Sequence, residues 1–172
     1  MRVVLVEPEI HWNAGNVGRT CVATGTSLHL VCPLGFSLDA AAIRRSGLDY
    51  WERLDLKVHD SLDAFLGGLS ADASLLLFTA DAPRTLWEAP FTPESWLLFG
   101  RESVGLPDSL LRRFAERTYR IPQTDKVRSL NVSTAAGVAV YEGLRRTGGL
   151  PAQRMPGASP GARHAGSRAA RE

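Results

Sequence analysis

The sequence predicts an α/β fold with a mostly parallel sheet and helices on both of its faces. Short, almost wholly apolar runs, such as those at 2–7 and 74–80, are typical of strands buried on both faces. Turn-forming glycines and prolines separate these runs from segments whose apolar residues recur at helical spacing. Strands and helices therefore alternate along the chain, which favours a parallel sheet.

The expected strands include one weak edge strand, and in chain order they are 2–7, 28–32, 57–59, 74–80, 95–100 and 118–122. The first expected helix starts near Asn13 or Asn16, either of which can cap it through its side-chain oxygen. The later expected helices are 38–47, 60–69, 107–114 and 131–146. For the last of these, Ser129 or Asn131 can act as the cap.

Length and composition indicate one folded domain followed by a tail. A chain of 172 residues can bury a core without disulfides or metals, and we expect the domain to span 1–147. Residues 148–172 are mostly Gly, Ala, Pro, Arg and Ser, a composition that buries too little apolar surface to fold. We therefore expect a disordered basic tail, as a solvated extension in the favoured interpretation and as a weak RNA contact in the alternative.

Several classes of protein are disfavoured by what the sequence lacks. No apolar run approaches the roughly 18 residues of a membrane span, and the N-terminus turns acidic too early for a signal peptide. We therefore expect a cytoplasmic protein without a membrane partner. The net charge is +2, but residues 147–172 contribute +3, which leaves the folded part at −1, so any nucleic acid must be held by a local patch or by the tail.

Familiar catalytic and metal-binding motifs are also missing. There is no G-x-G-x-x-G after the first strand, no P-loop lysine, no H-E-x-x-H and no G-x-S-x-G. The four histidines are scattered and have no cysteine or carboxylate at ligand spacing, so we expect no metal. Cys21 and Cys32 are interpreted as small core residues.

Three polar, glycine-bearing or cationic stretches each follow an expected strand. They are NAGNVGR at 13–19, FGRESVGLP at 99–107 and IPQTDKVRSLNVS at 121–133. Any one of them is explained by a turn and a helix cap. Together they favour a site, because ligands of open α/β sheets bind at the carboxyl ends of the strands. The N-terminus of the last helix, with Arg, Lys and hydroxyls close by, is suited to hold a ligand.

These three stretches resemble the three sequence motifs of the SPOUT superfamily of methyltransferases. Longer segments, including RRSGLDYW and LLFGRESVGLP, are similar to the tRNA (cytidine/uridine-34-2′-O)-methyltransferases, and the resemblance covers roughly 3–146. It implies a sheet with a C-terminal trefoil knot, S-adenosylmethionine as cofactor, and methylation of the ribose 2′-hydroxyl at the wobble position of the tRNA anticodon stem-loop. Methylation of another tRNA or rRNA nucleotide, and a non-catalytic RNA-binding module, remain the alternatives.

The resemblance also assigns residues to the cofactor. The matching positions are Phe78, Thr79, Gly100, Ile121, Ser129 and Leu130. Gly100 suits this role because a residue without a side chain lets backbone approach a flat ring. Phe78 can equally be an ordinary core residue.

The resemblance implies three catalytic residues, Arg19, Glu102 and Asn131. Arg19 either accepts the hydroxyl proton or clamps a phosphate that orients the ribose, since free guanidinium is a poor base; a surface helix arginine is the plain alternative. Glu102 is expected to hold loop backbone or a basic partner. Asn131 can cap its helix and also bond the ligand.

Substrate binding and assembly are the least determined features. The candidate RNA contacts are Arg44, Arg45, Arg101, Lys126 and Arg128, each of which alone is also consistent with a solvated surface charge. The resemblance implies a homodimer through the helix 131–146, although the same apolar stripe can cover the protein's own sheet. The run QTDKV at 123–127 and the run NVST at 131–134 depart from the family pattern, which leaves the choice of RNA less certain than that of the cofactor.

Overall fold

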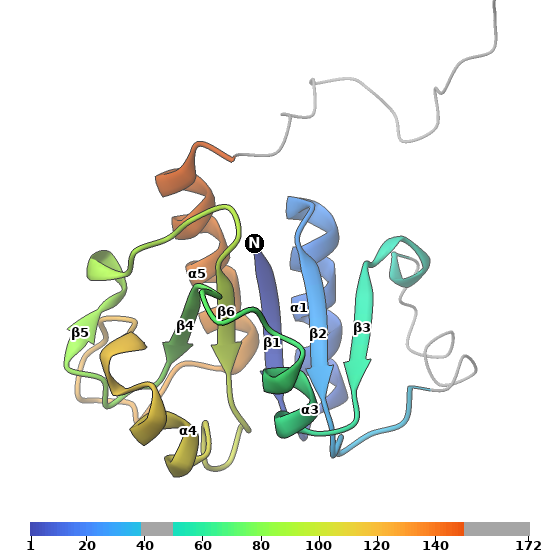
Figure 1. The fold of residues 1–172 in the computed structure, drawn as a ribbon, viewed down its shortest axis with the longest axis horizontal. Coiled ribbons are helices and arrows are strands. Elements are labelled where there is room, and N and C mark those ends of the chain that lie inside the picture. Colours follow the sequence, from blue (N-terminus) through green and yellow to red (C-terminus); the bar gives the residue numbers. More distant parts are fainter. Residues whose placement is uncertain (39–49, 150–172) are drawn as a thin grey trace, which may run out of the picture.

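The computed structural model describes residues 1–38 and 50–149, and these residues form a parallel sheet with helices on both faces (Figure 1). Within the described residues the sheet has seven strands in the order β3-β2-β1-β6-β4-β7-β5, and each neighbouring pair is parallel. The strands are β1 Arg2–Val6, β2 Ser27–Val31, β3 Leu56–His59, β4 Leu75–Phe78, β5 Arg84–Thr85, β6 Trp96–Phe99 and β7 Thr118–Arg120. The predicted α/β class is confirmed, and β3 lies at an edge as expected. The two-residue strand β5 was not predicted.

Four α-helices and three short 3-10 helices connect the strands in the described part of the chain. The α-helices are α1 His11–Thr24, α3 Leu62–Gly67, α4 Asp108–Arg113 and α5 Val132–Thr147. The 3-10 helices are η1 Trp51–Arg53, η2 Leu86–Glu88 and η3 Ala115–Arg117. The helix expected at 38–47, the candidate residues Arg44 and Arg45, and the tail from 150 onward lie outside the described residues. None of the described helices is long and apolar enough to cross a membrane.

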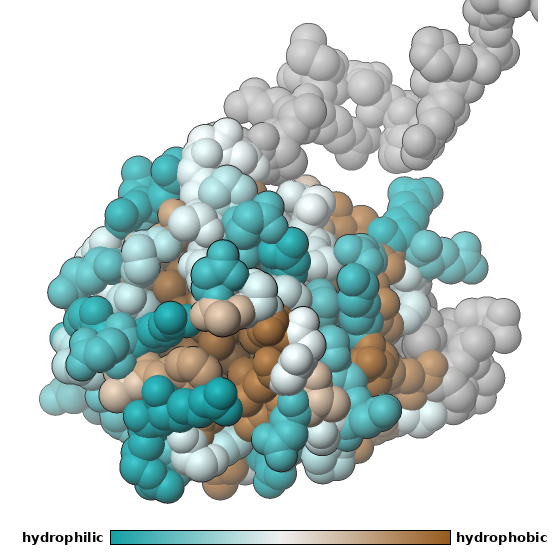
Figure 2. Space-filling model, in the orientation of Figure 1, coloured by the Kyte–Doolittle hydropathy of each residue, from teal (hydrophilic) through white to brown (hydrophobic). Residues whose placement is uncertain are grey.

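Two apolar cores lie on opposite faces of the sheet. Alternate residues of a strand point to opposite faces, so Val3 and Leu5 pack against α1 and α5, while Val4 and Val6 pack toward α3 and α4. Figure 1 shows α1 and α5 behind the sheet and α3 in front of it. Figure 2 shows the front, where apolar side chains gather over the middle and hydrophilic side chains surround them. The predicted two-sided covering of the sheet is therefore confirmed.

The apolar stripe of α5 packs on the protein's own sheet. Ala136, Ala139 and Val140 are fully buried, and Leu144 is nearly so. Of the two uses considered for this stripe, covering the sheet is the one that the structure shows. The opposite side of the helix remains exposed at Val138 and Tyr141.

The start of α1 corrects the sequence prediction. The helix begins at His11 with Ile10 at the N-cap position, and no side chain of the cap residue bonds the helix. Asn13 and Asn16 therefore lie inside the helix and do not cap it. At α5 the prediction of Asn131 as the cap is confirmed, because its side-chain oxygen accepts bonds from the backbone amides of Ser133 and Thr134.

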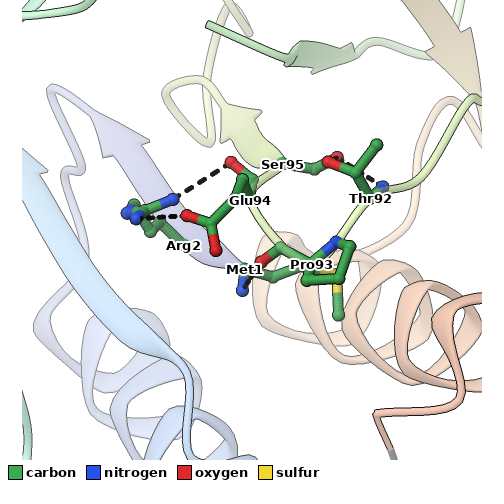
Figure 3. A network of polar contacts seen from close by, with 6 residues as sticks. All are labelled: Met1, Arg2, Thr92, Pro93, Glu94 and Ser95. Atoms are coloured by element: carbon green, nitrogen blue, oxygen red, sulfur yellow. Dashed lines mark hydrogen bonds and ion pairs between the residues drawn. The ribbon is translucent and has the colours of Figure 1, made fainter.

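The N-terminal residues fix the pairing between β1 and β6. The guanidinium of Arg2 donates to the backbone oxygen of Glu94 at 3.0 Å and to its carboxylate at 2.7 Å, and the Arg2 amide donates to Ser95 at 2.9 Å (Figure 3). The terminal amine of Met1 donates to Pro93. These contacts lie at the amino-terminal ends of the strands, so the opposite edge is left to the polar loops.

A pair of histidines joins β2 to β3. Nδ1 of His29 and Nε2 of His59 are 2.8 Å apart, and the rings of Phe65 and Trp96 meet them edge-on. His29 is only 3% exposed. Burial, with further contributions from the nearby charges of His59 and Lys57, lowers the pKa of His29 from 6.5 to about 4. The folded protein therefore holds this imidazole neutral.

We predict that the protein loses stability as the pH falls from about 6.5 toward 4. The lowered pKa means that the unfolded chain takes up the His29 proton first, so stability is fully present above pH 6.5 and declines below it. Between pH 7 and pH 4.5 the loss from this group is about 2–3 kcal/mol. Urea unfolding at several pH values should show that His29→Leu flattens this dependence and that His11→Asn, at an exposed position, does not. Equal slopes in all three proteins would contradict the assignment.

Candidate functional site

A cavity of about 490 Å³ lies beyond the carboxyl ends of β4, β6 and β7. Three loops form most of its wall: residues 78–81 after β4, residues 99–105 after β6, and residues 121–135, which lead from β7 into α5. Ile10 and Asn13 close it from the start of α1. All three polar stretches singled out in the sequence therefore meet at one place, as their positions at strand ends predict.

The loop after β6 folds back on itself through a close backbone approach at Gly100. The amides and carbonyls of Arg101 and Gly105 pair in both directions, at 3.1 and 2.9 Å, and Gly105 has a positive φ of 78°. A Cβ at Gly100 would lie 2.0 Å from the carbonyl carbon of Gly105. The sequence reasoning attributed the glycine to close approach of a ligand. In the structure, the backbone that needs this space belongs to the same loop.

The carboxylate of Glu102 lies just before the N-terminus of α1 and holds the residues that lead into the helix. It accepts hydrogen bonds from the amide of Glu9 at 2.8 Å and the amide of Ile10 at 3.3 Å. In return, Glu9 accepts bonds from the amide and hydroxyl of Ser103 at 2.9 and 2.8 Å. A negative charge is favourable there because the first amides of a helix lack intrahelical partners and the helix dipole is positive at this end. Of the two roles considered for Glu102, holding backbone is the one seen.

Asn13 connects Glu102 to the third loop. Its side-chain amide donates to Glu102 at 2.8 Å, and its side-chain oxygen accepts from the amide of Asn131 at 2.9 Å. The side-chain oxygen of Asn131 accepts hydrogen bonds from the backbone amide and the hydroxyl of Ser133 at 2.9 and 2.6 Å. Asn13 is buried, at 6% exposed. The series Glu102, Asn13 and Asn131, called the polar chain below, therefore joins all three stretches.

Sequence reasoning missed the role of Asn13. The residue was interpreted as a helix cap, which its side chain is equally suited to make. The available signal was its place in the same stretch as Arg19, but burial and a bond to a residue 118 positions away are not visible in a sequence.

The six residues assigned to the cofactor by resemblance all line the cavity. They are Phe78, Thr79, Gly100, Ile121, Ser129 and Leu130. Phe78 is also a core residue, as the alternative held, because it is only 7% exposed and its ring stacks on Phe99 with centroids 5.0 Å apart. The structure therefore brings these six residues together at one cavity.

The candidate RNA contacts divide into separate groups. Arg101 and Arg128 line the cavity, while Lys126 is exposed on the same loop as Arg128 but outside the lining. Arg101 forms an ion pair with Glu7, the residue that directly follows β1 and has a positive φ of 53°. Arg101 and Arg128 therefore bring positive charge to the cavity lining, and Glu7 balances the charge of Arg101.

Arg19 lies on the exposed side of α1 and outside the cavity lining. Its guanidinium carbon is 4.6 Å from the centre of the Tyr50 ring, and the Tyr50 hydroxyl donates to the Gly15 carbonyl at 2.5 Å. Among the described residues we find no hydrogen bond or ion pair to Arg19. A guanidinium that stacks on an aromatic face keeps its N–H groups available at its edge. The donors of Arg19 are therefore available to an anion.

No group of three or more His, Cys, Asp or Glu side chains is placed to hold a metal ion in the described part of the chain. Cys21 is buried, and burial raises the pKa of its thiol to about 11. The cavity lining offers backbone groups, amides, hydroxyls and cations, together with the carboxylates of Asp81 and Glu102.

Fold and cavity together are those of an α/β protein with a candidate ligand site beyond the carboxyl ends of parallel strands. Residues 1–141 match the SpoU rRNA Methylase family, and the chain belongs to this family. A tRNA (cytidine(34)-2′-O)-methyltransferase of Burkholderia pseudomallei is 45% identical over 85% of this chain and 95% of its own length.

Solved structures agree with this membership. One, from work on the 2-OH methylation of C/U34 on tRNA, is 49% identical, with a TM-score of 0.79 over 84% of this chain and 94% of that one. An RNA 2′-O ribose methyltransferase is 27% identical, with a TM-score of 0.73 over 85% of this chain and 56% of that one.

We predict that Glu102→Ala lowers the free energy of unfolding by about 2 kcal/mol. The substitution removes the acceptor for two helix-terminal amides and leaves the buried amide of Asn13 without its partner. Urea unfolding at pH 7 measures the effect. Glu116→Ala is the matched control, because that carboxylate is 96% exposed in a surface ion pair and its removal should change stability little. Equal losses in the two variants would show that Glu102 does not hold the loops.

Proposed function

We propose that this protein transfers a methyl group from S-adenosylmethionine to the ribose 2′-hydroxyl of the wobble nucleotide of a tRNA. One observation supports this most: the three motif loops of the family meet at one cavity and are joined there by the polar chain. Relatives at 45 and 49% identity carry out, or are studied for, this modification. The substrate is the anticodon stem-loop, and the cytoplasm is where the enzyme works.

The cavity fits the cofactor in size and in lining. A volume of about 490 Å³ lies within the range of small-ligand sites. We propose that backbone groups at Gly100, Ile121 and Leu130, which line the cavity, bind the adenosine part, and that Thr79 and Ser129 add hydroxyls. When bound, S-adenosylmethionine supplies a methyl group on a sulfonium, which is already an activated leaving group.

The protein's own part in the reaction is to position the ribose hydroxyl. Positioning can contribute up to about 7–11 kcal/mol to a bimolecular step. Of the two roles open for Arg19, the phosphate clamp is the one we propose, because its guanidinium makes no hydrogen bond or ion pair among the described residues and a guanidinium is a poor base. The clamp orients the ribose and favours loss of its proton.

Cations near the cavity are proposed to hold the RNA backbone. Arg101 and Arg128 lie in the lining and Lys126 lies beside them, so the anticodon loop meets positive charge at the mouth. Arg44 and Arg45 are candidates outside the described residues. The basic tail, 148–172, is proposed as a disordered extension of the domain.

We predict that the unaltered protein transfers labelled methyl groups to total tRNA and that nuclease mapping places the label at nucleotide 34. Label only in rRNA, or elsewhere in tRNA, would favour the second substrate, and none despite cofactor binding would favour a non-catalytic module.

Arg19→Ala should lower turnover by about 10² or more while cofactor affinity stays nearly unchanged, because Arg19 lies outside the lining. Arg112→Ala, an exposed arginine on the opposite face of the sheet, is the control. A large loss of cofactor affinity in Arg19→Ala would contradict the clamp.

We also propose a homodimer through the outer surfaces of α1 and α5, two helices that contact each other. This surface exposes Trp12 at 60%, Tyr141 at 51% and Val138 at 36%. Burial of such side chains is favourable at roughly 25 cal/mol per Å². Arg19 lies on the outer side of α1 too, so a second copy packed there would be its neighbour.

The trefoil knot is a further part of the proposal, supported by β7, which comes last among the strands yet lies between β4 and β5.

Sedimentation equilibrium should show a dimer that Trp12→Glu shifts toward monomer by at least about tenfold in dissociation constant. A carboxylate in the first turn is compatible with the helix, so the fold should survive. Val58→Glu, at an exposed position on the edge strand β3, is the control and should remain dimeric. Unaltered association in Trp12→Glu would rule out this interface.

A further inference from the structure

The loop between β7 and α5 is closed by a single side chain. Residues 122–129 are all exposed. The side-chain nitrogen of Gln123 donates to the carbonyl of Val127 at 3.2 Å and to the carbonyl of Arg128 at 3.1 Å. In the part of the chain that the structure describes, these are the side-chain hydrogen bonds found within the loop, and they enclose a backbone turn at 125–126. Gln123 therefore closes a ring of six residues.

This ring lies directly against the cavity. Gln123 and Arg128 both belong to the lining, and Ser129 and Leu130 continue it after the ring. From Asn131 onward the chain is fixed, because Asn131 bonds to Asn13 and caps α5. Ile121 at one end packs on the apolar core and Asn131 is fixed at the other, so Gln123 adds a side-chain restraint to the exposed residues between them.

We propose that Gln123 is a positioning residue that pre-forms the cofactor-binding wall and thereby sets the affinity for S-adenosylmethionine. The inference rests on the proposed function, since it concerns the same cavity. A wall that is already ordered before binding loses less conformational freedom when the ligand arrives. The gain appears in the affinity for the cofactor and leaves the methyl-transfer step itself little changed.

The chemistry of the side chain suits this role. A primary amide carries two N–H donors on one nitrogen, so it can serve two successive carbonyls at once. Methionine has about the same length and no donor. Glutamate has the same shape and only acceptors, which would face the two carbonyls unfavourably. Gln123→Met and Gln123→Glu therefore both remove the closure without shortening the side chain.

Gln123 has one competing role, because it is itself part of the lining. A direct contact with the cofactor would also lower the affinity in these variants. The two roles differ in the ligand-free protein. Loss of a loop closure opens the loop there, whereas loss of a ligand contact leaves the loop as it was.

Trypsin reports this difference because Lys126 and Arg128 are inside the loop. In a native protein the cleavage rate follows the population of the locally opened form when opening is fast. Fragments cut after these two residues, quantified by mass spectrometry in the full-length ligand-free protein, therefore measure loop opening. Calorimetric titration with S-adenosylmethionine, and the KM and kcat of methyl transfer to tRNA, measure the consequence.

In both Gln123 variants we expect cleavage about tenfold faster than in the unaltered protein. The affinity for S-adenosylmethionine should fall about tenfold, and the KM for S-adenosylmethionine should rise about tenfold. The kcat at saturating cofactor should stay within about twofold of the unaltered protein's value. A tenfold change corresponds to about 1.4 kcal/mol, the order expected for two exposed hydrogen bonds. Thr124→Ala is the matched control, since the neighbouring side chain makes no hydrogen bond in the structure, and it should match the unaltered protein in every measurement.

Weaker cofactor binding with unchanged cleavage would overturn the proposal in favour of a direct contact, and unchanged affinity would overturn it as well. An equal loss in KM and kcat would likewise contradict a role confined to binding. Failure of the unaltered protein to bind S-adenosylmethionine would instead contradict the proposed function, while the cleavage rates alone would still decide whether Gln123 closes the loop.

Discussion

The carboxylate of Glu102 at the start of α1 is the contact on which the site depends. It bonds Asn13, which is 89 positions away in the sequence, and Asn13 in turn bonds Asn131, which is 118 positions from Asn13. Hydrogen bonds to a charged acceptor are stronger than neutral ones, and a buried amide without its partner is costly. Three loops that are distant in the sequence are therefore held in one arrangement around the cavity.

Most of the fold could be predicted because its strands are buried on both faces. Runs such as 74–80 leave little choice of secondary structure, and their alternation with helical segments is sufficient to indicate a parallel sheet. The failures have local causes. Strand β5 has two residues and thus no period to detect. The start of α1 was misplaced because the residues before it are held by Glu102, in a distant loop, while the nearby asparagines offered a good local cap.

The lining of the cavity could be named from the sequence, but the contacts that shape it could not. Resemblance to a family placed residues such as Ile121 and Leu130 at the site, and all six assigned positions line it. The burial of Asn13, the backbone packed against Gly100 and the loop closure by Gln123 are tertiary facts without a periodic signal. The same holds for Arg19. Its motif singled it out, but the motif does not reveal that the guanidinium stacks on Tyr50 outside the cavity.

The most direct test of this account is a crystal structure of the protein with S-adenosylmethionine bound. The account predicts that the cofactor occupies the cavity against the backbone at Gly100, Ile121 and Leu130, and that the bonds from Asn13 to Glu102 and to Asn131 keep their present lengths of 2.8 and 2.9 Å. A cofactor found elsewhere on the protein, or a site reached only after these bonds break, would contradict it.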